Sequence, residues 1–323
     1  IVILFNNLGF VEGYSKIFMG GLGGFLTNNF PIYLWGAILG EIYNVSGGAK
    51  SIAHSVAKAF RGNKDHIEPI TSILIIFVAG TVMAYGGISS IVLMFVLMPL
   101  TLEVMRESKI PHYMAPGILL GSIATAALAM PGSPQLHNSI PPTYLGTSPT
   151  AALIPGLIGG VVVIGLNIFY LNYEARKEIS AGNVYNLEMV ASSSDAADYN
   201  ADYENLPNAF VSLIPLLTTF AFYNFMKLYV GYSILLGILV AIVCFWNQLG
   251  LIKTIVDIFG RGAKTSTHLC VASASLAGFG AVVSATEAFK QFSVTITSIP
   301  GPPLITAAIA VALVTGICGS GPA

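Results

Sequence analysis

Charged residues are scarce in this sequence. Only 9% of its 323 residues are Asp, Glu, Lys or Arg, against about 25% in soluble domains, and none lies between Lys109 and Glu174. In contrast, 54% of the residues are hydrophobic and the mean hydropathy is +0.77. Because so few charges do not cover the surface of a soluble particle of this size, we expect an all-α polytopic membrane protein in a lipid bilayer.

The sequence also lacks the features of several functional classes. Its 14 basic and 15 acidic residues are balanced, whereas nucleic-acid binding requires a concentrated basic surface. Its three cysteines stand in apolar runs and predict neither a disulfide framework nor a metal site. The absence of His-Glu-x-x-His, Gly-x-Ser-x-Gly and filter-repeat motifs argues against an intramembrane enzyme and an ion channel. We therefore expect no catalytic residues, no metal and no cofactor.

Apolar runs divide the chain into two transmembrane halves, since about 20 such residues cross a bilayer. The halves are residues 1–173 and 207–323, and the polar, acidic stretch 174–206 between them predicts a flexible cytoplasmic linker. Uninterrupted apolar runs lie at about 24–43, 149–173, 207–224, 229–248 and 303–318. We expect no signal peptide, and the apolar ends lead us to expect truncation at both termini.

The apolar run 70–102 is interrupted by Tyr85-Gly86-Gly87-Ile88-Ser89-Ser90. Each arm has about 15 residues, roughly 22 Å as helix, which is short for a crossing. Basic residues flank the run on both sides, so the positive-inside rule places both of its ends in the cytoplasm. The arm lengths favour a re-entrant hairpin, although two short spans satisfy the same rule. The run 265–299, broken around Gly278-Phe279-Gly280, predicts a second hairpin.

A helix at about 113–129 leads into a segment, 130–142, that contains four prolines and several polar residues. This segment is not continuous helix, so the region 113–147 is expected to be a broken transmembrane helix. Non-helical backbone at membrane depth requires protein or a water-filled cavity around it. An ordinary loop outside the membrane is the alternative interpretation.

The two halves repeat one order of elements: a span, a basic surface helix, an apolar stretch broken by glycines, and an interrupted helix. The paired segments are 47–61 with 251–264, 70–102 with 265–299, and 130–142 with 316–322. Paired discontinuous segments are typical of secondary transporters and indicate the binding site. An inverted repeat would put the ends of the second hairpin outside, whereas the span count and the basic residues put them inside. Whether the repeats are inverted therefore stays open.

Five segments carry a resemblance to a known family. They are GGAKSIAH (47–54), YGGISSIVLMFVLMPLTLEV (85–104), PGSPQLHNSIPPTYLGTSPTAA (131–152), GFGAVVSAT (278–286) and GICGSGPA (316–323). They resemble the gluconate permease family, within the ion-transporter superfamily of organic-anion carriers. The resemblance implies proton-coupled symport of a gluconate-like sugar acid or a hydroxybutyrate-like short carboxylate, through two re-entrant hairpins and two unwound helices. We expect an elevator-type, alternating-access movement, and a homodimer in the bacterial cytoplasmic (inner) membrane.

A small carboxylate bound within a membrane needs hydrogen-bond donors without much net charge. Unwound backbone and half-helix N-termini supply N–H groups, Ser, Thr, Asn and Gln supply side-chain donors, and glycine allows close approach. The residues that offer this chemistry at the two hairpin tips and two helix breaks are Gly86, Gly87, Ser89, Ser90, Ser133, Gln135, Asn138, Gly278, Gly280, Ser284, Thr286, Gly319 and Ser320. We predict that they bind the substrate, although single small residues in membrane helices more often serve helix packing.

Two residues are candidates for proton coupling. His137 is the only ionisable residue within the broken helix, and its titration range suits a proton carrier. Glu287 lies beside the second tip, with Lys290 one turn later as a possible partner. If His137 is inert, carbonyl, Ser and Asn oxygens at the breaks suit Na⁺ instead. Both ions are therefore kept as alternatives, and the sequence does not identify the organic acid.

Overall fold

The structure is a computed structural model. It describes residues 2–5, 9–61, 67–88, 90–125, 130–135, 137–138, 142, 146–148, 150–185, 206–250, 252–298 and 302–318. These residues form helices and no strand, which confirms the all-α prediction for the part of the chain that is described. Three predicted site residues, Ser89, Gly319 and Ser320, lie outside the described residues, as do residues 186–205 of the predicted linker.

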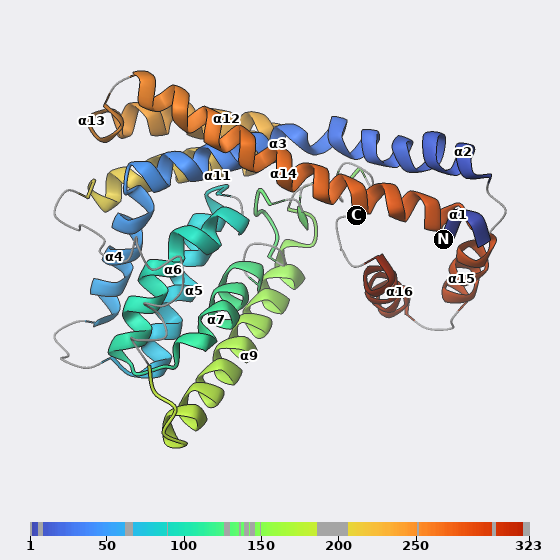
Figure 1. Cartoon of the computed structure of the whole chain (residues 1–323). Helices are drawn as coiled ribbons and strands as arrows, with labels where there is room; N and C mark the ends of the chain where they lie inside the picture. The colour runs from blue at the N-terminus through green and yellow to red at the C-terminus, as the bar shows by residue number, and fades with distance from the viewer. Residues whose placement is uncertain are drawn as a thin grey trace. The chain divides into compact units, whose positions relative to one another are not determined.

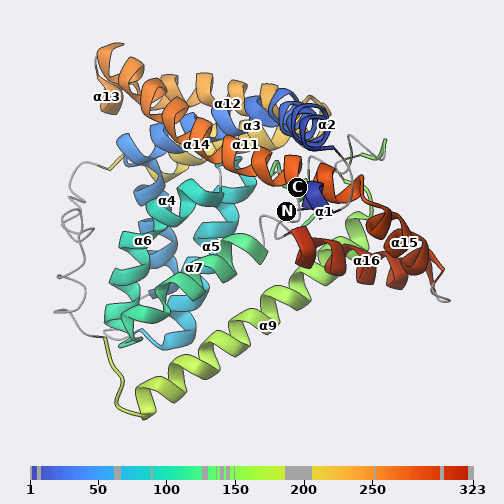
Figure 2. The same cartoon turned by 45° about the vertical axis from the view of Figure 1, so that its right-hand side comes forward.

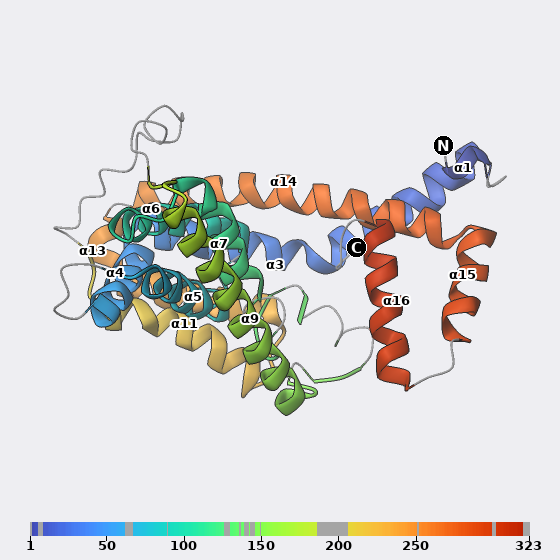
Figure 3. The same ribbon diagram turned by 90° about the horizontal axis from the view of Figure 1, so that it is seen from below.

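The chain divides into two compact units (Figure 1, Figure 2, Figure 3). Unit 1 is Ile1–Leu34 with Lys264–Ala323, and unit 2 is Trp35–Ala263. Both borders fall within long helices, α3 (Met19–Val45) and α14 (Ile252–Ser284). The predicted halves, residues 1–173 and 207–323, were defined by the order of elements along the sequence and not by contacts. They stay a prediction.

Unit 2 is built around a pair of helices, α5 and α6, that are consecutive in the chain. Helices α4 and α7 pack against both members of the pair, and α9 packs against α5 and α7. Helix α11 packs against α4, α5 and α12. The elements that lie wholly within unit 2 are α4 (Gly48–Arg61), α5 (Pro69–Tyr85), α6 (Ser90–Glu107), η2 (His112–Met114), α7 (Ala115–Ile123), α9 (Leu153–Ser180), α11 (Ala209–Asn224), α12 (Val230–Cys244) and α13 (Trp246–Leu249).

The predicted hairpin at 70–102 is a helical hairpin in the structure. Helices α5 and α6 have 17 and 18 residues, about 25 Å each at 1.5 Å per residue. The two helices are in contact, and both carry fully buried side chains, including Ile76 and Met83 of α5 and Leu93 and Leu97 of α6. Re-entry into a membrane and two short spans are both compatible with such a hairpin, so the re-entrant form stays a prediction.

The described part of the broken segment, residues 130–135, is non-helical, as predicted from its prolines. Helix α9 begins beyond it and continues to Ser180, into the start of the predicted linker. Glu174 and Lys177 form an ion pair of 3.2 Å on this helical extension, a spacing that stabilises exposed helix. The predicted linker therefore begins too early, because its first charged residues complete a helix.

Among the described residues, two helices are long and apolar enough to cross a membrane, α9 and α14. The apolar stretch of α9 is only 6% buried, and large side chains such as Ile154, Val161 and Phe169 are exposed. An uninterrupted apolar surface of this extent is unfavourable in water and suits a lipid environment. This observation agrees with the composition.

Unit 1 contains the first part of α3, most of α14, and several shorter helices. These are α1 (Val2–Phe5), α2 (Phe10–Glu12), the π-helix η1 (Gly13–Phe18), α15 (Glu287–Thr297) and α16 (Pro303–Cys318). Helix α14 approaches η1 and α3 closely: a Cβ on Gly278 would lie 2.8 Å from the carbonyl oxygen of Phe18, and one on Gly21 would lie 2.7 Å from the Cβ of Ala281. Small residues therefore permit this contact.

Two expectations about residues 251–299 are wrong. Helix α14 continues without a break through Gly278 and Gly280, and the turn to α15 falls at Ala285–Thr286. The predicted surface helix 251–264 is not a separate element, because its described residues form the first part of α14. The physical reason is that Gly278 serves close helix packing, which leaves the helical backbone intact.

Candidate functional site

The broken segment after α7 lies against the tip of the α5–α6 hairpin. Gln135 joins them: its Nε2 donates to the carbonyl oxygens of Ala84 (2.9 Å) and Ile88 (2.8 Å), and Ser90 Oγ donates to its Oε1 (3.1 Å). Gln135 is only 6% exposed, so these bonds form in a water-poor environment. The structure thus brings together the first predicted tip and the first predicted break. We call this contact the tip–break junction.

The carbonyl oxygens of the broken segment also accept hydrogen bonds from side chains. Three side chains donate to the consecutive carbonyl oxygens of residues 130–132: Asn138 to the first, Tyr85 to the second (3.1 Å) and Asn224 to the third (2.9 Å). Buried carbonyl groups need such partners outside regular helix. The non-helical backbone is therefore satisfied by protein, which is the condition for its survival at membrane depth.

Two glycines of the junction have backbone that only glycine adopts easily. Gly87 has φ of +92° and Gly132 has φ of +80°, a region that L side chains rarely occupy. Helix α11 packs directly against the tip, because a Cβ on Gly86 would collide with Leu216 and one on Gly87 would lie 2.9 Å from Thr219 Cγ2. Glycine at the tip therefore permits both the turn and the contact with α11.

Two buried hydroxyl groups, one in the broken segment and one on α11, have no hydrogen-bond partner among the described residues. They are Ser133 Oγ and Tyr223 OH, and the two residues are 0% and 3% exposed. Ser133 follows Gly132 and Tyr223 precedes Asn224, so each is next in the chain to one end of the Asn224–Gly132 hydrogen bond. Buried hydroxyls are normally paired, so these two groups are exceptions that call for an explanation.

His137, the first candidate for proton coupling, lies in the same segment and is exposed. The neighbouring Asn138 is half-buried and bonds the first carbonyl of the segment. The role of His137 in coupling stays a prediction.

The second predicted cluster belongs to unit 1 and has other contacts. Gly278 and Gly280 are buried within α14, and Ser284 is its exposed last residue. Thr286 is buried and caps α15, because its Oγ1 accepts a hydrogen bond of 3.2 Å from the backbone N–H of Phe289. The structure describes no unpartnered buried hydroxyl in this cluster. A ligand-binding role for these residues stays a prediction.

Glu287, the second candidate for proton coupling, is exposed and forms an ion pair with Lys290. The Nζ–Oε2 distance is 3.0 Å, and both side chains are more than half exposed. This is the pairing expected from their spacing along the helix. An exposed ion pair explains Glu287 without a role in proton transfer.

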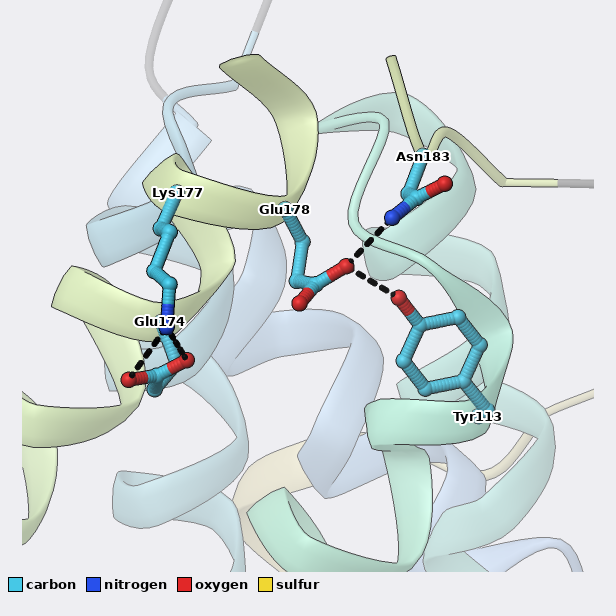
Figure 4. A network of polar contacts seen from close by, with 5 residues as sticks. All are labelled: Tyr113, Glu174, Lys177, Glu178 and Asn183. Atoms are coloured by element: carbon cyan, nitrogen blue, oxygen red, sulfur yellow. Dashed lines mark hydrogen bonds and ion pairs between the residues drawn. The ribbon is translucent and has the colours of Figure 1, made fainter. Parts of the chain in front are cut away.

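A polar network fixes the charged end of α9, beyond its apolar stretch (Figure 4). Tyr113 OH and Asn183 Nδ2 both donate to Glu178 Oε2, at 2.6 and 2.7 Å. These two hydrogen bonds lower the pKa of Glu178, and the bond to the carboxylate raises the pKa of Tyr113. The network is exposed to water and joins α9 to η2, so its role is structural.

Helix α11 was not singled out by the sequence, since it lies in an ordinary apolar run. Its contribution to the junction comes from Thr219, Tyr223 and Asn224. The available signal was weak: Thr219 and Tyr223 are four residues apart and so share one helix face, at the end of an apolar span. No motif distinguishes this pattern from helix packing.

The sequence is similar to known membrane transporters. The sequence profile described as GntP family permease matches residues 11–221, which include the hairpin, the broken segment and most of α11. The chain is also similar to the uncharacterized transporter YxjC of Bacillus subtilis (strain 168). The two are 25% identical over an alignment 346 positions long, which covers 95% of this chain and 71% of that relative.

Proposed function

Since this chain belongs to the GntP permease family and is thus a membrane transporter rather than an enzyme, we propose that it carries a small organic anion by proton-coupled symport. The family match confirms the resemblance to gluconate permeases described above. The proposed substrates are gluconate-like sugar acids and hydroxybutyrate-like short carboxylates. The proposed location is the bacterial inner membrane, where the chain crosses several times and forms a homodimer.

One observation carries the proposal that the substrate is an anion. At the tip–break junction, the carbonyl oxygens of Ala84, Ile88 and residues 130–132 already accept hydrogen bonds from side chains. The unpartnered polar atoms are instead the hydroxyls of Ser133 and Tyr223. A carboxylate accepts and never donates hydrogen bonds, so unpaired donors suit it.

The engagement of these carbonyl oxygens favours H⁺ over Na⁺ as the coupling ion. Na⁺ prefers oxygen ligands, and carbonyl oxygens that accept hydrogen bonds from side chains are weaker ligands than unpaired ones. His137 lies in the same segment, and histidine is a side chain able to take up and release a proton. We therefore propose His137 as the proton-coupling residue.

For the movement, we propose that the α5–α6 hairpin and the broken segment travel together. Gln135 joins the two by three hydrogen bonds, so a ligand at the junction would move with both. Such rigid-body motion of one bundle is how alternating access operates in many secondary transporters. The proposal is an elevator-type movement of this bundle.

The test is uptake of radiolabelled gluconate and 3-hydroxybutyrate into liposomes that contain the full-length protein. An inward pH gradient and an inward Na⁺ gradient are imposed separately, with protein-free liposomes as the control. Accumulation driven by the pH gradient alone supports the proposal. Accumulation driven only by Na⁺ refutes proton coupling, and the absence of uptake of either acid refutes the substrate class.

A second experiment addresses His137. In the His137→Gln variant we expect the pH gradient to lose its ability to drive accumulation, while exchange of internal for external substrate continues. A matched control is His268→Gln in unit 1, which should behave as wild type. If His137→Gln accumulates substrate as wild type does, His137 is not the coupling residue.

A further inference from the structure

We propose that the hydroxyls of Ser133 and Tyr223 donate hydrogen bonds to the carboxylate of the transported anion, which makes α11 a part of the substrate site. This inference rests on the proposed function. It goes further because it assigns the binding of the carboxylate to two atoms, one of them on a helix that no sequence motif marks.

The first argument is the state of these two hydroxyls. Both residues are more than nine-tenths buried, and neither hydroxyl has a partner among the described residues. A buried hydroxyl without a partner has lost its hydrogen bonds to water and has gained none from protein. A ligand that supplies an acceptor removes this deficit, so the arrangement is explained if the site is filled during transport.

The second argument is position. Asn224 donates to the carbonyl oxygen of Gly132 (2.9 Å), and it therefore ties the end of α11 to the broken segment. Tyr223 and Ser133 are the immediate chain neighbours of these two residues. Pro134, on the other side of Ser133, is within contact distance of a Cβ placed on Gly87 at the hairpin tip. Ser133 thus lies between the hairpin tip and the attachment of α11.

The third argument is the use of the remaining polar groups. Both amide hydrogens of Gln135 and the hydroxyl of Ser90 are engaged in holding the tip. The amides of Asn138 and Asn224 and the hydroxyl of Tyr85 hold the broken segment. These groups therefore position the junction. Among the described residues, the buried side-chain hydroxyls of the broken segment and α11 that are left without a partner are those of Ser133 and Tyr223. A carboxylate has two acceptor oxygens and is therefore able to accept from two donors.

The test uses Tyr223→Phe and Ser133→Ala in the full-length protein, reconstituted in liposomes. For each we expect the KM for uptake of gluconate or 3-hydroxybutyrate to rise about tenfold or more, the usual effect of losing a hydrogen bond to a charged group. Because neither hydroxyl is paired without ligand, thermal unfolding of the substrate-free variants should occur at the wild-type temperature or higher. Reduced affinity together with unreduced stability is the specific expectation.

Matched controls remove hydroxyls that do have protein partners. Tyr43 OH donates to the carbonyl oxygen of Ser212, and Ser122 Oγ donates to the carbonyl oxygen of Leu119 in its own helix (2.8 Å). For Tyr43→Phe we expect a lower unfolding temperature with an unchanged KM, since a buried carbonyl loses its donor. For Ser122→Ala we expect an unchanged KM.

Competition with unlabelled butyrate identifies the group of the substrate that is bound. If the hydroxyls bind the carboxylate, each variant weakens inhibition by butyrate and by 3-hydroxybutyrate to the same extent. If only 3-hydroxybutyrate is affected, the hydroxyls bind the substrate hydroxyl and the carboxylate assignment is overturned.

Failure of this inference is distinct from failure of the proposed function. Wild-type transport with an unchanged KM in both variants overturns the inference and leaves the carrier function intact. No uptake of any carboxylate by the wild-type protein refutes the proposed function itself. If one variant unfolds at a lower temperature than wild type, its hydroxyl has a structural partner and the inference is overturned for that residue.

Discussion

The hairpin tip at Gly86–Ile88 and the segment Gly278–Thr286 are similar in composition and different in structure. At the tip, Gly87 adopts a positive φ, the chain reverses, and side chains from the broken segment bond its carbonyls. In the other segment, Gly278 and Gly280 continue a helix, and the turn comes only at Ala285–Thr286. Glycine near small polar residues therefore has two uses in this protein, and the contacts around it decide which one applies.

The difference has a physical origin in the neighbours. Gly278 faces the backbone of Phe18, so its missing side chain allows two helices to approach. Gly86 and Gly87 face side chains of α11, and Gln135 donates hydrogen bonds to carbonyl oxygens at the end of α5 and in the turn. A ligand site needs the second arrangement, because there the backbone has left the helix.

The largest effect should come from Gln135→Ala. This variant removes the side-chain donor to the carbonyl oxygen of Ile88, one of several donors to that of Ala84, and the acceptor of Ser90. Each buried polar group left unpaired costs about 1–3 kcal/mol of folding free energy, so we expect a clearly lower unfolding temperature and at least tenfold slower uptake. Gln248→Ala on the exposed α13 is the control. Normal uptake and stability in Gln135→Ala would show that the tip needs no such attachment.

The next largest effects are expected for Gly87→Ala and Gly278→Ala, which compare the two glycine segments directly. Gly87→Ala forces a positive φ on alanine, at about 1–2 kcal/mol, and brings its Cβ against Thr219. We expect a raised KM as well as reduced stability. Gly278→Ala should lower the unfolding temperature through its contact with Phe18 and leave the KM unchanged. Uptake kinetics and thermal unfolding of both variants test this expectation. A raised KM in Gly278→Ala together with an unchanged KM in Gly87→Ala would place the binding site in unit 1.

Thr286→Ala should have a moderate effect. The side chain caps α15, and loss of such a cap costs about 1 kcal/mol, so the unfolding temperature should fall slightly while the KM stays at the wild-type value. Thr295→Ala, at an exposed position where the hydroxyl bonds only within its own helix, is the control. A raised KM in Thr286→Ala alone would return Thr286 to the substrate site.

The smallest effect is expected for Tyr113→Phe. The hydrogen bond from Tyr113 contributes to the lowered pKa of Glu178, so it stabilises the folded state above the ordinary carboxyl pKa of 4.5 and is lost as the pH falls through the lower folded value. The variant should therefore unfold slightly more easily at neutral pH, and like wild type at a pH below the folded pKa of Glu178. Thermal unfolding at both pH values measures this, with Tyr170→Phe at an exposed position of α9 as control. Altered uptake in Tyr113→Phe would assign this network a role in transport.

Local composition was sufficient for the class of protein and for much of the helix map. The all-α class follows from hydropathy alone, and the predicted apolar run 303–318 corresponds to α16. The four prolines after α7 excluded continuous helix, and residues 130–135 are indeed non-helical. These are properties of consecutive residues, because helix length and helix interruption depend on the chain itself.

Partner assignments required the tertiary structure. The sequence grouped Gln135, Ser90 and Ser133 as equivalent donors, whereas the structure uses the first two to hold the tip and leaves the Ser133 hydroxyl unpaired. It gave no reason to select Tyr223, and it assigned a break to Gly278, which packs against Phe18.

Hydrogen bonding and close packing depend on groups that are distant in the chain. Gln135 and its partners at the hairpin tip are 45 to 51 residues apart, and Asn224 and Gly132 are 92 residues apart. Residue type determines only what a side chain is able to donate or accept. Which donors are used for the fold and which are left for a ligand was decided by the folded arrangement.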